Sequence, residues 1–268
     1  PFADYLQAGT NRLSIGVQSF DNEHLQRLGR IHSSDNAQKA IQQARQAGFE
    51  RVNVDLMHGL PQQTLEQALL DLRLAVECGA THVSWYQLTI EPNTVFFRTQ
   101  PILPEEDLLL EIQQQGEAYL KAQGFINYEV SAWRKELPSR HNLNYWQFGD
   151  YLAIGAGAHG KVSQPDGIYR FQKSRMPKDY LAKVPAPALQ WQRIDDEDMP
   201  FEFMMNALRL NEGVPSEFYQ QRTGLPLSSI AATVEKLQQQ QLLIEDPERL
   251  ACTEKGHLFL NSVLEEFL

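Results

Sequence analysis

The sequence predicts an α/β protein in which a partial barrel of βα units precedes a small, helical, winged-helix-like domain. Three observations support this prediction. A helix–glycine–strand pattern repeats in the first half, the predicted strands alternate apolar and polar side chains, and the last third has helical periodicity around one short hairpin. With 268 residues, the chain can form one large domain or a large domain and a small one.

The repeated unit is a helix that ends at glycine and continues into a strand. The predicted strands cover residues 12–19, 51–57, 82–90 and 128–133. Four such units in succession favour parallel strands with helices between them. Two helix starts agree with this pattern. Thr64 and Gln67 form a predicted capping box, and Ser33 or Ser34 is the expected cap of the preceding helix.

The predicted strands have one apolar face and one small, polar face. Val54 and Leu56, for example, alternate with Asn53 and Asp55. Because Val, Ile and Leu normally fill the interior of a parallel barrel, a polar interior predicts a lumen that holds a ligand. A half-solvated antiparallel sheet alternates in the same way, but it does not have helices between successive strands.

Polar residues follow the strands at the ends where parallel barrels place their functional groups. These residues are Gln18, Asp55 with His58, and Gln87 with Glu91. Each of them, taken alone, is explained equally well as a cap of the next helix or a partner of loop amides. Their expected convergence on one rim favours a functional interpretation.

Composition excludes several classes of protein. The net charge of −10 disfavours generic binding to nucleic acids. No apolar run reaches the roughly 18 residues that span a bilayer, and no export signal opens the chain. Cys78 and Cys252 stand far apart, so we expect no disulfide framework and a reducing, cytoplasmic location.

Six segments, in this order along the chain, resemble the HemN/HemW radical S-adenosylmethionine (SAM) family. They are Asn11–Phe20, Leu28–His32, Asp55–Pro61, Tyr86–Pro92, His141–Trp146 and Gly155–Gly160. The resemblance covers essentially the whole chain. It implies a partial radical SAM barrel in residues 1–162, an irregular linker in 163–195 and a winged-helix-like C-terminal domain in 196–268.

The resemblance also implies cofactors. The family holds a [4Fe–4S] cluster through a CxxxCxxC motif, whose thiolates bind iron, and this chain has no such motif. Because the chain opens on what looks like the last turns of a helix, we expect the cluster-binding front to be missing. The cluster would then belong to the full-length protein only, and the barrel would be open, with edges that could pair in a homodimer.

Three residues match the family's SAM contacts, namely Gln18, Arg30 and Asp55. A carboxylate accepts hydrogen bonds from ribose hydroxyls or an ammonium group, and a guanidinium binds a carboxylate in a bidentate way. The alternative for two of them is a structural Arg30–Asp55 salt bridge.

The segment His141-Asn-Leu-Asn-Tyr-Trp resembles the HNxxYW motif of the HemW branch, whose histidine is implicated in haem binding. A neutral imidazole is an ordinary axial ligand of haem iron. His159 is a second candidate ligand. The alternative is that His141 caps a helix while Tyr145 and Trp146 belong to the core.

The resemblance therefore predicts a SAM-binding haem chaperone that transfers haem to acceptor proteins, with the acceptor's identity and any membrane association left open. The alternative is oxygen-independent coproporphyrinogen III dehydrogenase, which carries out oxidative decarboxylation in porphyrin synthesis, so whether the protein is an enzyme also stays open. A DNA-binding winged helix is disfavoured, because residues 196–268 contain 13 acidic and 5 basic residues.

Overall fold

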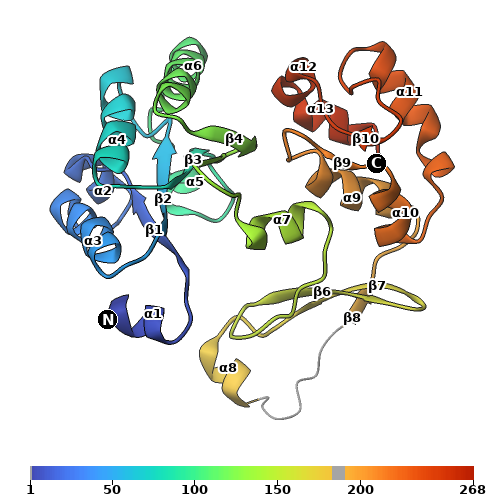
Figure 1. Ribbon diagram of the computed structural model, residues 1–268, viewed down its shortest axis with the longest axis horizontal. Coiled ribbons are helices and arrows are strands. Elements are labelled where there is room, and N and C mark those ends of the chain that lie inside the picture. Colours follow the sequence, from blue (N-terminus) through green and yellow to red (C-terminus); the bar gives the residue numbers. More distant parts are fainter. Residues whose placement is uncertain (1, 183–190) are drawn as a thin grey trace. The chain divides into compact units, whose positions relative to one another are not determined.

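The computed structural model describes residues 2–182 and 191–268, and the chain forms two compact units, Pro1–Leu137 and Pro138–Leu268 (Figure 1). The predicted division at residues 162 and 195 follows the sequence pattern and stays a prediction.

The first unit is an open, mixed sheet with helices against one face. Its helices are α1 (Phe2–Gln7), α2 (Asn22–Arg27), α3 (Ser34–Gln46), α4 (Leu65–Glu77), α5 (Val95–Thr99) and α6 (Glu106–Ala122). Its strands are β1 (Arg12–Gln18), β2 (Arg51–His58), β3 (His82–Gln87), β4 (Ile126–Glu129) and β5 (Ala132–Arg134), in the order β1-β2-β3-β5-β4. In the described part of the chain, this sheet has two free edges, so the prediction of an open, partial barrel is confirmed.

Three of the four predicted βα units are parallel as expected. β1 pairs with β2 and β2 pairs with β3 in parallel. The fourth predicted strand, 128–133, is wrong, because the chain turns at Val130 and forms two antiparallel strands instead. The side-chain amide of Asn127 donates to the carbonyls of Glu129 and Ala132, at 2.8 and 3.1 Å. This local hydrogen bonding stabilises the turn, and the alternation of side chains across it hides the turn from a periodicity argument.

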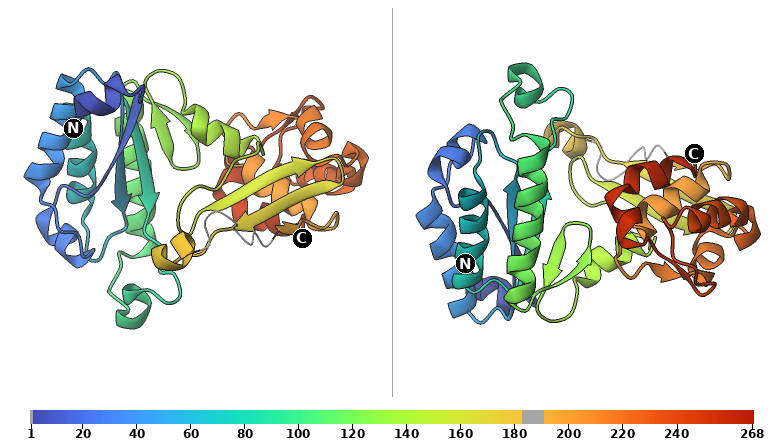
Figure 2. Two further views of the ribbon diagram at one scale, coloured as in Figure 1. Left: turned by 90° about the horizontal axis from the view of Figure 1, so that it is seen from below. Right: turned by 90° about the horizontal axis from the view of Figure 1, so that it is seen from above.

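The core of the first unit lies between the sheet and helices α3, α4 and α6, which line up along one face (Figure 2). Val52, Val54 and Leu56 of β2 are completely buried there. Gly116 of α6 is required for this packing, because a Cβ at that position would lie 2.0 Å from the indole ring of Trp85. The caps agree with the sequence: Thr64 and Gln67 form the capping box of α4, and Ser33 caps α3.

The second unit begins with α7 (Arg140–Trp146) and an antiparallel sheet of β6 (His159–Gln164), β7 (Gly167–Gln172) and β8 (Trp191–Arg193), with α8 (Pro177–Ala182) inserted. The irregular linker predicted for residues 163–195 is therefore wrong for its described part, while residues 183–190 lie outside the described residues. Pro165-Asp166-Gly167 is a turn sequence between two runs of alternating residues, and this hairpin signal was outweighed by the prolines and charges around it.

The rest of the second unit is the winged-helix-like domain. It contains α9 (Met199–Ala207), β9 (Val214–Pro215), α10 (Glu217–Thr223), the 3-10 turn η1 (Leu227–Ser229), α11 (Ala231–Gln239), β10 (Arg249–Leu250), α12 (Glu254–Leu258) and α13 (Leu260–Glu265). The short hairpin predicted in the last third is present, since Leu243 bridges Cys252, and β10 also pairs with β9. The last helical segment of the chain is broken at Phe259, where α12 ends and α13 begins.

Among the described residues, no helix is both long enough and apolar enough to cross a membrane.

Candidate functional site

The polar face of the sheet carries a hydrogen-bonded cluster formed by Ser14, Asn53, Asp55 and Ser84. Cross-strand register brings them together, because Ser14 pairs with Asn53, and Asp55 pairs with Ser84. The Asn53 amide donates to Asp55 Oδ1 at 2.7 Å and to the hydroxyl oxygens of Ser14 and Ser84 at 2.8 and 3.0 Å. The face that the alternation predicts to be polar therefore is polar, and its side chains support one another.

Asp55 is the acceptor of this cluster. It is half-buried, and this burial raises the pKa of its carboxyl, although hydrogen bonds from Ser14, Ser84 and Asn53 and the charge of Arg12 oppose the shift. A carboxylate has about four acceptor positions, so the partly exposed Asp55 can accept further hydrogen bonds from a ligand. An acceptor held by its neighbours in one orientation suits the hydroxyls of a ribose or an ammonium group.

Gln18 is the last residue of β1, and its backbone pairs with Leu56, the residue after Asp55. Its backbone φ of 71° is left-handed, and the register with β2 shifts between Gly16 and Gln18. A Cβ on Gly16 would lie 3.0 Å from the Gln18 side-chain nitrogen, and Gly16 itself pairs with Asp55. The missing side chain of Gly16 therefore leaves room for the Gln18 amide on the polar face, next to Asp55.

The turn after Gln18 is anchored by Asp71, a residue that the sequence analysis missed. The Ser19 hydroxyl and the Phe20 amide donate to its carboxylate at 2.8 and 2.6 Å. Burial raises the pKa of Asp71 to about 7, although these two hydrogen bonds oppose the shift. The signal was an aspartate at a buried position of the apolar stripe of α4, next to Leu72.

Arg30 is the third of the predicted SAM contacts. It is exposed between α2 and α3, and its backbone amide donates to the Leu25 carbonyl at 2.9 Å. In the described part of the chain no salt bridge links it to Asp55, so the structural alternative for this pair is not found.

The other strand-end candidates separate. His58 is buried on the helix-covered side, where its ring centroid lies 4.3 Å from that of Trp85. This burial lowers its pKa to about 4. Gln87 and Glu91 are exposed, and Glu91 accepts a hydrogen bond from Thr89. His58 is thus part of the core, and the expected rim of five residues is reduced to Gln18 and Asp55 on the polar face.

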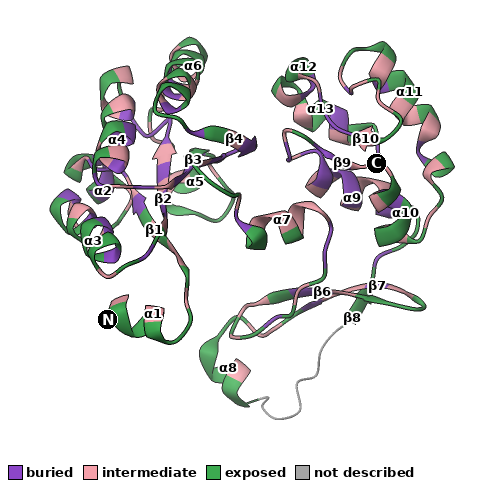
Figure 3. Ribbon diagram, viewed as in Figure 1, coloured by how far each residue is buried: buried purple, intermediate pink, exposed green. Residues whose placement is uncertain are grey.

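His141 lies on the surface of α7, which has no buried residue (Figure 3). It does not cap the helix, because the Ser139 hydroxyl accepts the Asn142 amide and serves as the cap. The ring of Tyr145, one turn further on, meets His141 edge-on at 4.8 Å. Within the described residues, no hydrogen bond occupies the His141 ring nitrogens.

The two aromatic residues of the same motif are partly packed. The Tyr145 ring lies 4.5 Å from that of Tyr151, and the Arg209 guanidinium lies 4.5 Å from the Trp146 ring. The core alternative therefore fits Tyr145 and Trp146 better than His141, and these rings fix the helix that presents the histidine.

His159, the second candidate ligand, is exposed at the start of β6. Close to it in sequence is an ion pair that the sequence analysis missed. The buried Lys161 ammonium donates to Asp150 at 3.2 Å and to the Phe148 carbonyl at 3.1 Å. This pair ties β6 to the segment that follows α7, and it belongs to the scaffold.

The residues fit the two implied cofactors differently. The partly exposed Asp55 and Gln18, over the space left by Gly16, are a suitable donor and acceptor set for SAM. The described residues contain no group of three metal-binding side chains, and Cys78 and Cys252 are both buried, in different units. The residues present do not fit an iron–sulfur cluster.

Comparisons with known proteins agree with this arrangement. The Radical SAM superfamily profile matches residues 2–75, and the HemN C-terminal domain profile matches residues 194–259. The heme chaperone HemW of Haemophilus influenzae is 48% identical over 269 residues, which cover 100% of this chain and 70% of that protein. The heme chaperone HemW of Escherichia coli is 49% identical, with coverages of 100% and 71%.

Among solved structures, the coproporphyrinogen III oxidase HemN of Escherichia coli, a radical SAM enzyme, has a similar fold. It matches with a TM-score of 0.77 at 23% identity, over 99% of this chain and 66% of that one. This likeness establishes the fold. Together with the sequence identity to the two chaperones, it shows that the chain belongs to the HemW family of radical SAM proteins.

Proposed function

We propose that this chain binds haem through His141 and passes it to acceptor proteins, and that the polar face of its sheet binds SAM through Asp55 and Gln18, with Arg30 as a further contact. The observation that carries the haem part is an exposed imidazole on α7, held by an aromatic neighbour and without a hydrogen bond to its ring nitrogens in the described chain. The name of the relatives, heme chaperone, supports the same assignment.

The chemistry of the site supports a ligand role for His141. An imidazole nitrogen that binds iron must be accessible, and a histidine on a helix surface meets this condition. Tyr145 limits the rotation of the imidazole from one side. His159 satisfies the same condition of access, so the proposal includes it as the competing ligand.

A haem titration followed by absorbance tests this proposal. His141→Ala should reduce haem affinity by about tenfold or more, because one iron–nitrogen bond is lost. His159→Ala should have a smaller effect if His141 is the ligand, and the larger effect if the roles are reversed. His257→Ala, which removes a half-buried histidine of the same unit, is the control. If both His141→Ala and His159→Ala leave the Soret band and the affinity unchanged, histidine ligation is wrong.

The SAM part is tested separately by calorimetric titration of the chain with SAM. Asp55→Asn and Gln18→Ala should each weaken binding, because each removes a donor or acceptor aimed at the polar face. Arg30→Ala tests whether the exposed arginine contributes. An unaltered affinity in all three variants would contradict the assignment of this face.

Coproporphyrinogen III dehydrogenase activity is the competing function, and the similarity of the fold to HemN is the observation that supports it. Conversion of coproporphyrinogen III by the longer protein with a reconstituted cluster would favour it.

Further parts of the proposal are haem-accepting proteins as partners, a homodimer through the open sheet edges, and a cytoplasmic location, which the two free thiols fit.

A further inference from the structure

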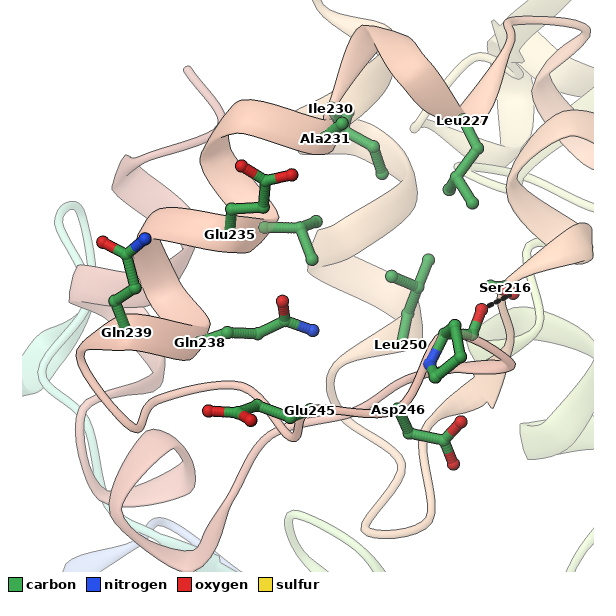
Figure 4. Close-up of a pocket in the computed structure, with 12 residues that line it drawn as sticks. Ser216, Leu227, Ile230, Ala231, Glu235, Gln238, Gln239, Glu245, Asp246 and Leu250 are labelled. Carbon is green, nitrogen blue, oxygen red and sulfur yellow. Dashed lines mark hydrogen bonds between the residues drawn. The ribbon is translucent and has the colours of Figure 1, made fainter.

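A groove of about 490 Å³ lies wholly within the winged-helix-like domain, between α11 and the hairpin turn before β10 (Figure 4). Its floor is apolar and includes Leu227, Ile230 and Leu250. Leu227 and Leu250 point into the groove from opposite sides. A cavity of this size with an apolar floor is in the range that proteins use to bind ligands or inserted side chains.

The rim of the groove is acidic. Glu235 comes from α11, whereas Glu245 and Asp246 come from the opposite turn, so carboxylates stand on both sides of the apolar floor. Glu235 and Glu245 are exposed. Among the described residues, neither of these two glutamates takes part in a salt bridge or a hydrogen bond.

The nearby cations are engaged elsewhere. Lys236 of α11 binds Glu266 at 2.5 Å, and Arg249 of β10 donates to the Glu212 carbonyl at 2.7 and 2.9 Å. The negative charge of the rim is therefore left for a partner to balance. In a DNA-reading winged helix, the corresponding helix and turn would present a basic face, whereas this groove is lined by Glu235, Glu245 and Asp246, which disfavours a nucleic-acid partner for this surface.

The turn that forms one wall is held in place. The Ser216 hydroxyl donates to the Pro247 carbonyl at 2.7 Å, the Asp246 carboxylate accepts the Glu248 amide at 2.8 Å, and the Gln238 amide of α11 donates to the Ile244 carbonyl at 2.9 Å. The last of these bonds joins the helix to the turn. The groove is therefore pre-formed, which lowers the entropic cost of binding.

We propose that this groove binds a short segment of a partner protein in which a large apolar side chain is flanked by lysines or arginines. The apolar side chain enters between Leu227 and Leu250, and the flanking cations meet Glu235 and Glu245. Charge complementarity on both walls, together with an apolar floor, selects this chemistry over an acidic or purely polar segment. The inference does not depend on haem binding or on SAM binding.

The test uses the 268-residue chain and a fluorescent hexapeptide in which two leucines are flanked on each side by two basic residues. Fluorescence anisotropy should show binding that weakens as salt is added, because exposed charges are screened. One control peptide replaces the leucines with serine, and another replaces the basic residues with glutamate. Both should bind at least about tenfold more weakly.

Variants of the chain locate the site. Ala231→Trp fills the groove from α11 and should abolish binding, and Glu235→Lys and Glu245→Lys should each weaken it by about three- to tenfold. Glu265→Lys reverses an exposed helical charge outside the groove and should leave affinity within about twofold. Methyl NMR signals of Leu227, Val234 and Leu250 should shift when the peptide is added.

The proposal is overturned if the basic peptide does not bind at about 1 mM, or if the serine peptide binds equally well. It is also overturned if Glu265→Lys weakens binding as much as the rim reversals, because the attraction would then come from net charge alone. A thermal melt of each variant separates loss of binding from loss of folding.

Discussion

The two faces of the β1–β2–β3 sheet show two different ways of placing polar groups in one structure. On the helix-covered face, Val54 and Leu56 exclude water and polar groups are rare. On the other face, Asp55 and Asn53 belong to a cluster in which each polar atom has a partner close by. Neighbouring residues of one strand therefore experience very different environments, because side chains alternate across it.

The pKa shifts of the titratable groups reflect this difference between the two faces. Asp71 and His58, on the helix-covered side, have pKa values shifted to about 7 and about 4, in each case toward the neutral form. Burial is the main cause for both, since an apolar environment penalises charge. Asp55 shifts in the same direction as Asp71, but three hydrogen-bond donors and Arg12 oppose the effect of burial. Hydrogen-bond donors on the polar face thus favour the ionised form of a carboxyl group, whereas the helix-covered face favours the neutral form of its titratable groups.

The largest effect expected from this comparison is that of Val54→Asp. A carboxylate at this completely buried position has no donor nearby, so the free energy of unfolding should fall by about 4 kcal/mol or more. Met57→Asp makes the same chemical change on the half-buried, polar side of β2 and should cost about 1–2 kcal/mol. Urea denaturation followed by circular dichroism measures both. Equal losses would show that the two faces do not differ as described.

The next effect is the pH dependence caused by Asp71. Its pKa is raised from 3.8 to about 7 on folding, so the folded chain holds the proton more tightly than the unfolded chain. The stability it provides is complete below about pH 4 and is lost as pH rises through 7, by up to about 4 kcal/mol. Asp71→Asn removes this titration. The variant should therefore gain stability relative to the wild type between pH 4 and pH 7 in urea melts, and a constant difference would contradict the assigned pKa.

His58 should give the opposite slope. Its pKa falls from 6.5 to about 4 on folding, so its contribution to stability is complete above pH 6.5 and is lost as pH falls through 4, by up to about 3 kcal/mol. The two slopes oppose each other between pH 4 and 6.5, and the wild type should show little net change from these groups. His58→Phe keeps a ring against Trp85 and removes the His58 titration. The stability of this variant should therefore fall as pH rises from 4 to 7, because of Asp71 alone. If the melting profile of this variant matches the wild type at every pH, His58 does not titrate as described.

Much of the first unit could be predicted from the sequence because alternation and capping are local properties. The alternation of apolar and polar residues around Asp55 predicts which face of the sheet each side chain occupies, and the Thr64–Gln67 capping box predicts the start of α4. The turn at Val130 could not be predicted in this way, because it depends on Asn127 binding two carbonyls across it, and the pattern of side chains continues through it.

The candidate site was predicted only in part. Ser14 and Asp55 share a face because β1 and β2 pair in register up to Gly16, which the sequence pattern anticipates, whereas Gln18 follows a register shift that the pattern does not show. Arg30 lies on an exposed connection, whose position depends on packing that no local pattern encodes. His58 was placed with the rim because it follows Asp55 closely, but an odd sequence separation directs it to the opposite face. Counting strand positions alone would have found this.

The smallest effect on stability should come from Asp55→Asn, which tests whether the polar face serves a ligand or the fold. The amide keeps one acceptor oxygen for Ser14 or Asn53, and the side chain is partly exposed, so the free energy of unfolding should change by less than about 1 kcal/mol. The affinity for SAM should fall by about tenfold or more, because the charge that meets an ammonium or ribose donor is lost. A melt and a SAM titration of the same variant separate the two roles. A large loss of stability with unchanged affinity would make Asp55 a structural residue, and the polar face would then resemble the helix-covered face in serving the fold alone.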